Sequence, residues 1–357
     1  SSYEGCEYIA PMGLGVPLPN TVAADVLVIL VASGLVWLGS GWLEDSAASI
    51  ATYYGLPPIV QGTLVVAIGS SFPEFASVII AARAGVFDIG VGAIVGSAVF
   101  NVLVVPAAAG LAAPDDELDA SRTLVYKEAQ FYMLAVSVLA ITFALAVIYE
   151  PVPAEPTLTG TITRPLAIVP LAVYGLYLFI QWQDTGDHVT ESVPGSVPIG
   201  REWATLLAGL AVILVSVELL VGAIESLAAA VGISEFLAGM TIIAAATSLP
   251  DTLVSVRSAR DDNSATSLGN VFGSNTFDLL VVIPVGVLLV GAVPVNFAVA
   301  VPMLAVLTLA TVLLFGMLRT NLTLTATESY ALAGVYALFV AWVVAETAGV
   351  TSLLRGG

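Results

Sequence analysis

The chain has 357 residues, of which 58% are hydrophobic and 10% charged, and its mean hydropathy of +1.01 is too high for a water-soluble domain. Its long apolar stretches can each cross a hydrocarbon core of roughly 30 Å, which predicts a polytopic membrane protein and excludes soluble enzymes. The charged residues comprise 9 Lys and Arg against 27 Asp and Glu, with Lys127 as the single lysine, so the sequence has no basic patch for nucleic acid. This acidic surplus predicts a salt-rich, halophilic source. The single cysteine, Cys6, excludes a disulfide within the chain.

Hydropathy and turn residues predict an all-α fold of ten membrane-spanning helices. In chain order they cover residues 25 to 45, 57 to 83, 88 to 112, 124 to 148, 165 to 182, 203 to 229, 235 to 258, 266 to 291, 297 to 318 and 328 to 348. Polar stretches precede the first span and separate the fifth from the sixth. The predicted parts are an external N-terminal segment (1–24), a first five-helix repeat (25–182), a cytoplasmic linker (183–201) and a second five-helix repeat (202–357).

An internal repeat relates the two five-helix units. At an offset of 177 residues, 62–105 aligns with 239–282 without a gap, and 13 of these 44 positions are identical. The matches include polar residues, such as Ser71 with Ser248, which shared hydrophobicity alone does not explain. Because each unit has an odd number of spans, the second enters the membrane from the opposite side. Inverted repeats are typical of secondary transporters, whose substrate site lies near the membrane midplane.

The basic residues predict the orientation in the cell membrane. With the N-terminus outside, six of the nine basic residues face the cytoplasm, as the positive-inside rule favours. These six are Arg122, Lys127, Arg201, Arg257, Arg260 and Arg319. We also expect the chain to act as a monomer in the lipid bilayer.

Carboxylates and prolines in the middle of two spans mark the candidate site. The second span contains the segment 69–74 and the seventh its counterpart 246–251, ending in Glu74 and Asp251. A charged side chain at the bilayer centre costs on the order of 3 kcal/mol, so each carboxylate needs a partner, a proton or a cation. The proline in each segment also frees a backbone carbonyl one turn earlier. Helical spacing places Ala67, Ser70, Ser71 and Glu74 on one stripe and Ala244, Thr247, Ser248 and Asp251 on its mirror.

The third and eighth spans each carry a pair of small residues and a pair of polar residues. Glycines four residues apart let helices approach closely, and polar residues four apart share one face. The pairs are Gly92 with Gly96, Gly269 with Gly273, Ser97 with Asn101, and Ser274 with Asp278. Four helices thus present oxygen-bearing groups without histidine or cysteine, which favours Ca²⁺, Na⁺ or K⁺ over zinc or copper.

The same residues also have purely structural interpretations, which compete with a cation site. A single Ser or Thr in a membrane helix usually bonds back to its own backbone, and a single glycine usually serves packing. However, no basic residue lies in the middle of a span, which argues against structural ion pairs for Glu74, Asp251 and Asp278.

Other acidic residues of the spans have less specific interpretations. Glu218 and Glu225 in the sixth span either line an access path or lie near a helix end. Glu44 and Asp45 end the first predicted span, and we expect both at the membrane interface. His188 belongs to the polar linker and is expected to be solvated.

Two pairs of segments carry a family signature. Residues 69–74 with 94–101 resemble the first α-repeat of sodium/calcium exchangers in the cation/calcium antiporter superfamily, and 247–251 with 269–275 resemble the second. The resemblance implies that Glu74 is a central Ca²⁺ ligand, and so is Asp251. The further Ca²⁺ and Na⁺ ligands that it implies are Ser70, Ser71, Thr247, Ser248 and the carbonyls of Ala67 and Ala244, flanked by Ser97, Asn101, Ser274 and Asp278.

The resemblance implies an antiporter that exchanges Na⁺ for Ca²⁺ by alternating access, is not an enzyme, and uses no cofactor besides the transported ions. One departure bears on potassium, because Asp278 is acidic where its repeat partner Asn101 is neutral. An aspartate there resembles the potassium-dependent branch, which co-transports K⁺ with Ca²⁺, although relatives without potassium dependence also carry it. A cation channel is the alternative from a different class.

Overall fold

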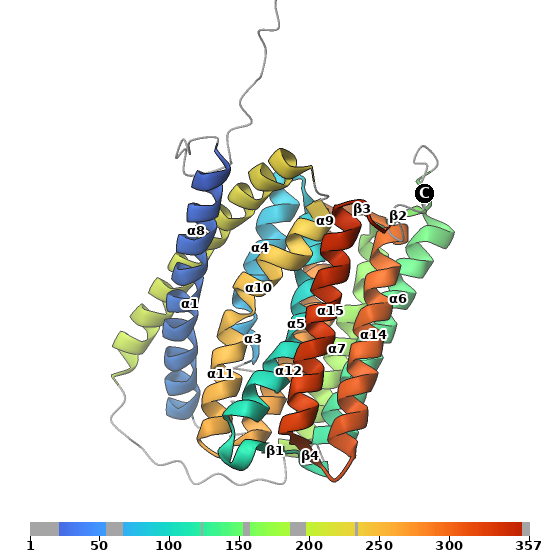
Figure 1. Cartoon of the computed structure of the whole chain (residues 1–357). Coiled ribbons are helices and arrows are strands. Elements are labelled where there is room, and N and C mark those ends of the chain that lie inside the picture. The colour runs from blue at the N-terminus through green and yellow to red at the C-terminus, as the bar shows by residue number, and fades with distance from the viewer. Residues whose placement is uncertain are drawn as a thin grey trace, which may run out of the picture.

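The computed structural model is mainly helical and describes residues 21–54, 67–122, 124–152, 158–185, 198–232 and 235–351 (Figure 1). Within these ranges, eight helices are long and apolar enough to cross a membrane, and one bent pair would make a ninth. The second predicted span, 57 to 83, falls partly on residues 55–66, which lie outside the described ranges. The prediction of a multi-pass helical membrane protein is confirmed, whereas the number of ten spans is not established.

The helices of the first half begin and end within a few residues of the predicted spans, except at the end of the first and at the start of the second, which lies outside the described residues. They are α1 (Val22–Tyr53), α3 (Ala67–Ser70), α4 (Phe72–Ala84), α5 (Phe87–Ala112), the short η2 (Pro114–Asp116), the π-helical turn η3 (Leu124–Glu128), α6 (Ala129–Tyr149) and α7 (Arg164–Thr185). The hydroxyl of Thr21 caps α1, and Gly85 ends α4 with a φ of 82°, a conformation that glycine adopts without strain.

The second half is more finely divided. Its elements are α8 (Ile199–Val231), α9 (Glu235–Ala238), the π-helical turn η4 (Gly239–Ile243), α10 (Ala244–Thr247), α11 (Leu249–Arg260), α12 (Ser264–Phe277), the π-helical turn η5 (Asp278–Val282), α13 (Ile283–Val290), α14 (Phe297–Arg319) and α15 (Ala326–Thr347). Asn263 and Asn296 cap α12 and α14, and Thr325 forms a capping box with Glu328 at the start of α15.

The internal repeat reappears in the positions where helices break. A break at Ser71 separates α3 from α4, and a break at Ser248, 177 residues later, separates α10 from α11. In the second half the segments on either side of the break are bent by 44°. Pro73 and Pro250 occupy the second position of the helix that follows, where a missing backbone N–H costs nothing. The prolines therefore start a new helix in the middle of each span.

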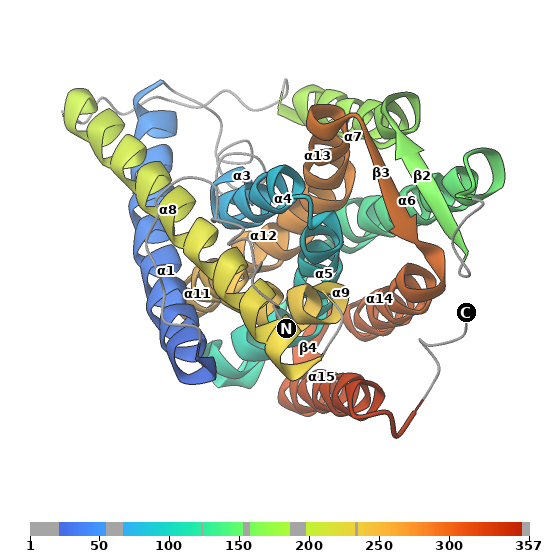
Figure 2. The ribbon, with the colours of Figure 1, turned by 90° about the horizontal axis from the view of Figure 1, so that it is seen from above.

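Two short antiparallel strand pairs join the two halves. Strand β1 (Glu117–Asp119) pairs with β4 (Thr323–Thr325), and β2 (Thr159–Thr163) pairs with β3 (Ala292–Asn296), as Figure 2 shows for the second pair. The pairs lie at opposite ends of the bundle (Figure 1). They satisfy backbone groups of the connections between helices.

Helix α5 lies at the centre of the bundle, and α1 with α8 forms one edge of it (Figures 1 and 2). Gly96 of α5 faces the backbone of Met240, and a Cβ at this position would overlap the Met240 carbonyl. Gly239 faces the backbone of Ile89 in the same way. The predicted close approach is confirmed at Gly96. At Gly269 no described residue outside its own helix lies within 4 Å of a Cβ placed there, so the close approach stays a prediction at that position.

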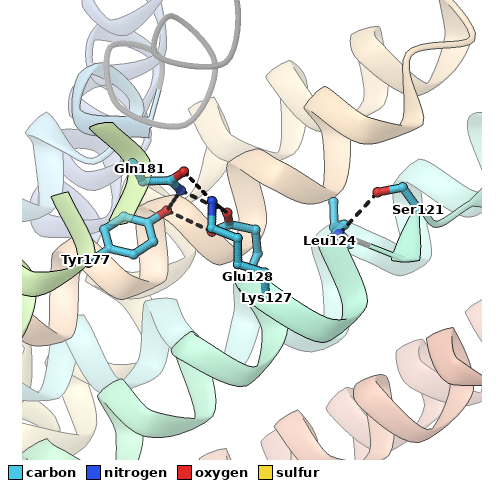
Figure 3. Close-up of polar contacts among 6 residues, drawn as sticks. All are labelled: Ser121, Leu124, Lys127, Glu128, Tyr177 and Gln181. Atoms are coloured by element: carbon cyan, nitrogen blue, oxygen red, sulfur yellow. Dashed lines mark hydrogen bonds and ion pairs between the residues drawn. The ribbon is translucent and has the colours of Figure 1, made fainter. Parts of the chain in front are cut away.

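A polar cluster fixes α7 against the start of α6 (Figure 3). Tyr177 and Gln181 each donate a hydrogen bond to the buried Glu128 carboxylate, at 2.9 and 2.8 Å. Lys127 donates to the Gln181 carbonyl oxygen at 2.7 Å, and its ammonium lies 3.4 Å from Glu128. Both carboxylate oxygens of Glu128 are thus paired, so this cluster serves packing rather than ion binding.

Candidate functional site

Three carboxylates are completely buried near the helix breaks. Glu74 is the third residue of α4, Asp251 is the third residue of α11, and Asp278 is the first residue of η5. The charge of Glu74 interacts with those of the other two. Because each break starts a new helix, Glu74 and Asp251 lie in first turns, where the helix dipole favours negative charge.

Hydrogen bonds satisfy both oxygens of Asp251. Asn101 of α5 donates to Oδ2 at 2.7 Å, and Asn270 of α12 donates to Oδ1 at 3.2 Å. Asn270 in turn accepts a hydrogen bond from Ser70 at 3.1 Å, and Asn101 donates also to Asn275 at 3.2 Å. Asp251 is therefore held in one orientation by amide groups from both halves.

The surroundings of Glu74 are different. Ser97 of α5 donates to Glu74 Oε1 at 3.1 Å and shares a 2.7 Å hydrogen bond with Ser248 of the second half. The other oxygen of Glu74, both oxygens of Asp278 and the hydroxyl of Ser71 are buried and have no hydrogen-bond partner within the described part of the chain. Asp278 lies beside Ser71. These four buried oxygen atoms favour a cation, which would compensate them electrostatically.

The difference between the two carboxylates follows from the sequence. Asn101, which donates to Asp251, corresponds in the repeat to Asp278, which cannot donate as a carboxylate. Asn270, the second donor, corresponds to Ala93. The side of the site around Glu74 therefore lacks the two amide donors present around Asp251.

The structure brings together most of the predicted site residues and gives a local role to others. Two hydrogen-bonded groups contain six of them: Glu74 with Ser97 and Ser248, and Asp251 with Asn101 and, through Asn270, Ser70. The two other carboxylate and hydroxyl residues, Asp278 and Ser71, lie beside each other. Thr247 and Ser274 donate to backbone carbonyls of their own helical turns, at 3.1 and 3.5 Å. The Ala244 carbonyl accepts the Ser248 N–H at 3.0 Å, and Ala67 is the first residue of α3.

The donor set of this site is mixed. Within the described ranges, no group of three or more acidic, histidine or cysteine side chains is arranged to hold a metal ion. A cation bound here would therefore need hydroxyl, amide or carbonyl oxygens in addition to carboxylates, which suits Ca²⁺ and Na⁺.

Two amide residues of the site were not among the predicted ligands. Asn270 and Asn275 both lie in the segment 269–275, and the position of Asn270 one turn before Ser274 could have indicated the site. The expectation for Glu44 at the membrane interface stays a prediction, but α1 continues to Tyr53 and one Glu44 oxygen is buried within the protein.

The comparisons with known proteins agree with this geometry. The family model described as "Sodium/calcium exchanger protein" matches residues 25–183 and 201–345. The chain is 30% identical to the CaxA protein of Alkalimonas amylolytica over 75% of its own length and 81% of that protein. It is 27% identical to the sodium/calcium exchanger MaX1 of Methanosarcina acetivorans, over 73% and 82% of the two chains.

A solved structure of the sodium-calcium exchanger NCX_Mj has the same fold. The TM-score is 0.63 at 25% identity, and the match covers 90% of this chain and 99% of the other. Because the family model spans most of both halves, the chain belongs to the sodium/calcium exchanger protein family and is a cation/calcium antiporter of the membrane.

Proposed function

We propose that the protein exchanges Na⁺ for Ca²⁺ across the cell membrane by alternating access of its two halves. Two buried hydrogen-bonded groups, each with residues from both halves, carry this proposal: one links Glu74 with Ser97 and Ser248, and the other links Asp251 with Asn101. Beside them, buried oxygen atoms have no partner among the described residues and are left for a cation. Such a site holds either several Na⁺ ions or one Ca²⁺ ion. This competition couples the two fluxes, because the site becomes exposed to the opposite side of the membrane with either Na⁺ or Ca²⁺ bound.

The proposed architecture is ten spans arranged as two inverted five-helix repeats, 25–182 and 202–357, acting as a monomer. The matching helix breaks at Ser71 and Ser248 support the repeat. The orientation has the N-terminus outside and the linker 183–201 in the cytoplasm, as the basic residues favour.

The proposed ligands remain those that the family resemblance implies. Glu74 and Asp251 are the central Ca²⁺ ligands, and hydroxyl and carbonyl oxygens around them complete the Ca²⁺ and Na⁺ sites. Thr247 and Ser274 donate to their own backbone, yet each hydroxyl oxygen can still face a cation with a lone pair.

Calcium uptake into proteoliposomes should require a Na⁺ gradient directed the opposite way. We expect uptake to stop when monensin dissipates that gradient. Without a net movement of Na⁺ in the opposite direction, no ion reorients the site after it has released Ca²⁺. Radioactive calcium measures the uptake, with liposomes free of protein as the control. Uptake that follows only the Ca²⁺ concentration, with no gradient present, would contradict exchange and support a channel.

The charge balance of the site decides the role of potassium. Asp278 adds a third carboxylate to Glu74 and Asp251, so bound Ca²⁺ leaves one charge uncompensated unless a monovalent cation or a proton joins it. Three Na⁺ ions leave the same site neutral. We propose potassium-independent exchange, with Asp278 protonated or only loosely involved when Ca²⁺ is bound. Potassium co-transport is the second candidate, and the unpaired oxygens of Asp278, counted over the described residues, favour it.

Removing K⁺ from both sides of the vesicles separates the two candidates. We expect Na⁺-driven calcium uptake to continue unchanged, because a proton on Asp278 already balances the charge. If uptake stops without K⁺ and the substitution Asp278→Asn restores it, the potassium-dependent function is correct. Wild-type vesicles containing K⁺ on both sides provide the control.

A further inference from the structure

A fourth carboxylate, Glu44 of α1, lies close to the candidate site. Its side chain passes Gly69 of the broken second span, and a Cβ at Gly69 would lie 3.8 Å from Glu44 Cγ and 3.0 Å from Leu43 Cδ2. The glycine thus leaves room for Glu44 beside α3. Helix α1 also contacts α10 and α11 (Figures 1 and 2).

The Glu44 carboxylate lacks the partners that a structural carboxylate usually has. Its Oε1 atom is buried without a hydrogen-bond donor from any described residue. Among the described residues Glu44 forms no ion pair. A carboxylate oxygen buried for stability is normally paired, because an uncompensated one is costly.

The position of Gly69 indicates the depth of Glu44. Gly69 lies two residues before the helix break at Ser71, and in the proposed orientation the second span runs from the cytoplasm outward. Glu44 packs beside Gly69 and therefore lies on the cytoplasmic side of that break.

We propose that Glu44 is a transient cation-binding residue between the cytoplasm and the central site. It offers a carboxylate oxygen to Ca²⁺ or Na⁺ before the ion reaches Asp251, and after the ion leaves it on the return step. This inference rests on the proposed exchange function and orientation. Carboxylate oxygen is a preferred ligand of both ions, and a cation supplies the charge that Glu44 otherwise lacks.

The test compares Glu44→Gln with Asp45→Asn. Asp45 is the next residue and carries the same charge, but its side chain is exposed, so it reports a general surface-charge effect. Everted membrane vesicles present the cytoplasmic face, and right-side-out vesicles present the external face. We expect Glu44→Gln to raise the KM for Ca²⁺ at the cytoplasmic face about threefold to tenfold, as loss of one nearby charge predicts. The KM at the external face and the maximal rate should stay near wild type, and Glu44→Asp should recover part of the affinity.

Three results would overturn the proposal. They are an unchanged cytoplasmic KM in Glu44→Gln, an equal rise in Asp45→Asn, and an equal rise at both faces, which would indicate general distortion of the site. Failure of the exchange function itself is distinguishable, because the wild-type protein would then show no Na⁺-dependent calcium uptake in either kind of vesicle.

Discussion

Glu74→Gln and Asp251→Asn should each abolish calcium exchange while leaving the protein folded. Each substitution keeps the size of the side chain but removes a charge that compensates the desolvation of Ca²⁺. Removing one partner of a buried charge pair costs about 3 kcal/mol or more, which corresponds to a loss of transport of about 100-fold or more. The measurement is Na⁺-driven calcium uptake in proteoliposomes, with elution from size-exclusion chromatography as the check on folding.

Two exposed residues provide matched controls for these substitutions. Glu150 follows α6 and Asp261 follows α11, and both side chains are exposed. Glu150→Gln and Asp261→Asn remove the same charge by the same chemistry, so we expect near-normal exchange in both. Near-normal exchange in Glu74→Gln or Asp251→Asn would instead place the ion site elsewhere in the protein.

Gly96→Ala should strongly destabilise the protein. The added methyl group overlaps the backbone carbonyl of Met240, and backbone at the crossing of α5 with η4 cannot rotate away as a side chain can. Overpacking of this kind costs on the order of 3 kcal/mol, which lowers the thermal midpoint of a chain of this size by about 4 °C. Thermal unfolding in detergent, followed by circular dichroism, measures the change.

Gly269→Ala is the control for this effect. Gly269 is also buried in a helix of the repeat, but the described residues leave the space around its Cβ position open. Alanine favours a helix over glycine, so we expect an unchanged or slightly higher midpoint. Equal midpoints for Gly96→Ala and Gly269→Ala would contradict this prediction, because they would show that α5 and η4 can move apart without a loss of thermal stability.

The helices were predictable from the sequence because a membrane span is a long, local signal. The predicted span 297 to 318, for example, corresponds to α14 (Phe297–Arg319). The end of α1 was not predictable in this way, because the polar run from Glu44 to Ser46 resembles a membrane interface. The short strands could not be predicted either. Three residues such as Glu117–Asp119 show no periodicity, and their partner is distant in sequence.

The chemistry of the site could be predicted, but its internal pairing could not. A carboxylate in the middle of an apolar span is unusual enough to identify Glu74 and Asp251. Which amide donates to which carboxylate depends on how α5 and α12 are rotated about their axes, and a sequence does not specify this rotation. That Asn101 and Asn270 both donate to Asp251 is therefore visible only in the structure.

The two strand pairs have a consequence for biogenesis. Strand β1 is translated early, but its partner β4 comes immediately before the last described helix, α15. Strand β2 likewise cannot pair until β3, in the second half, has been synthesised. During synthesis the backbone groups of β1 and β2 must remain bonded to water at the membrane surfaces until those later segments have been inserted. The first half therefore reaches its final form only after nearly the whole chain has left the ribosome.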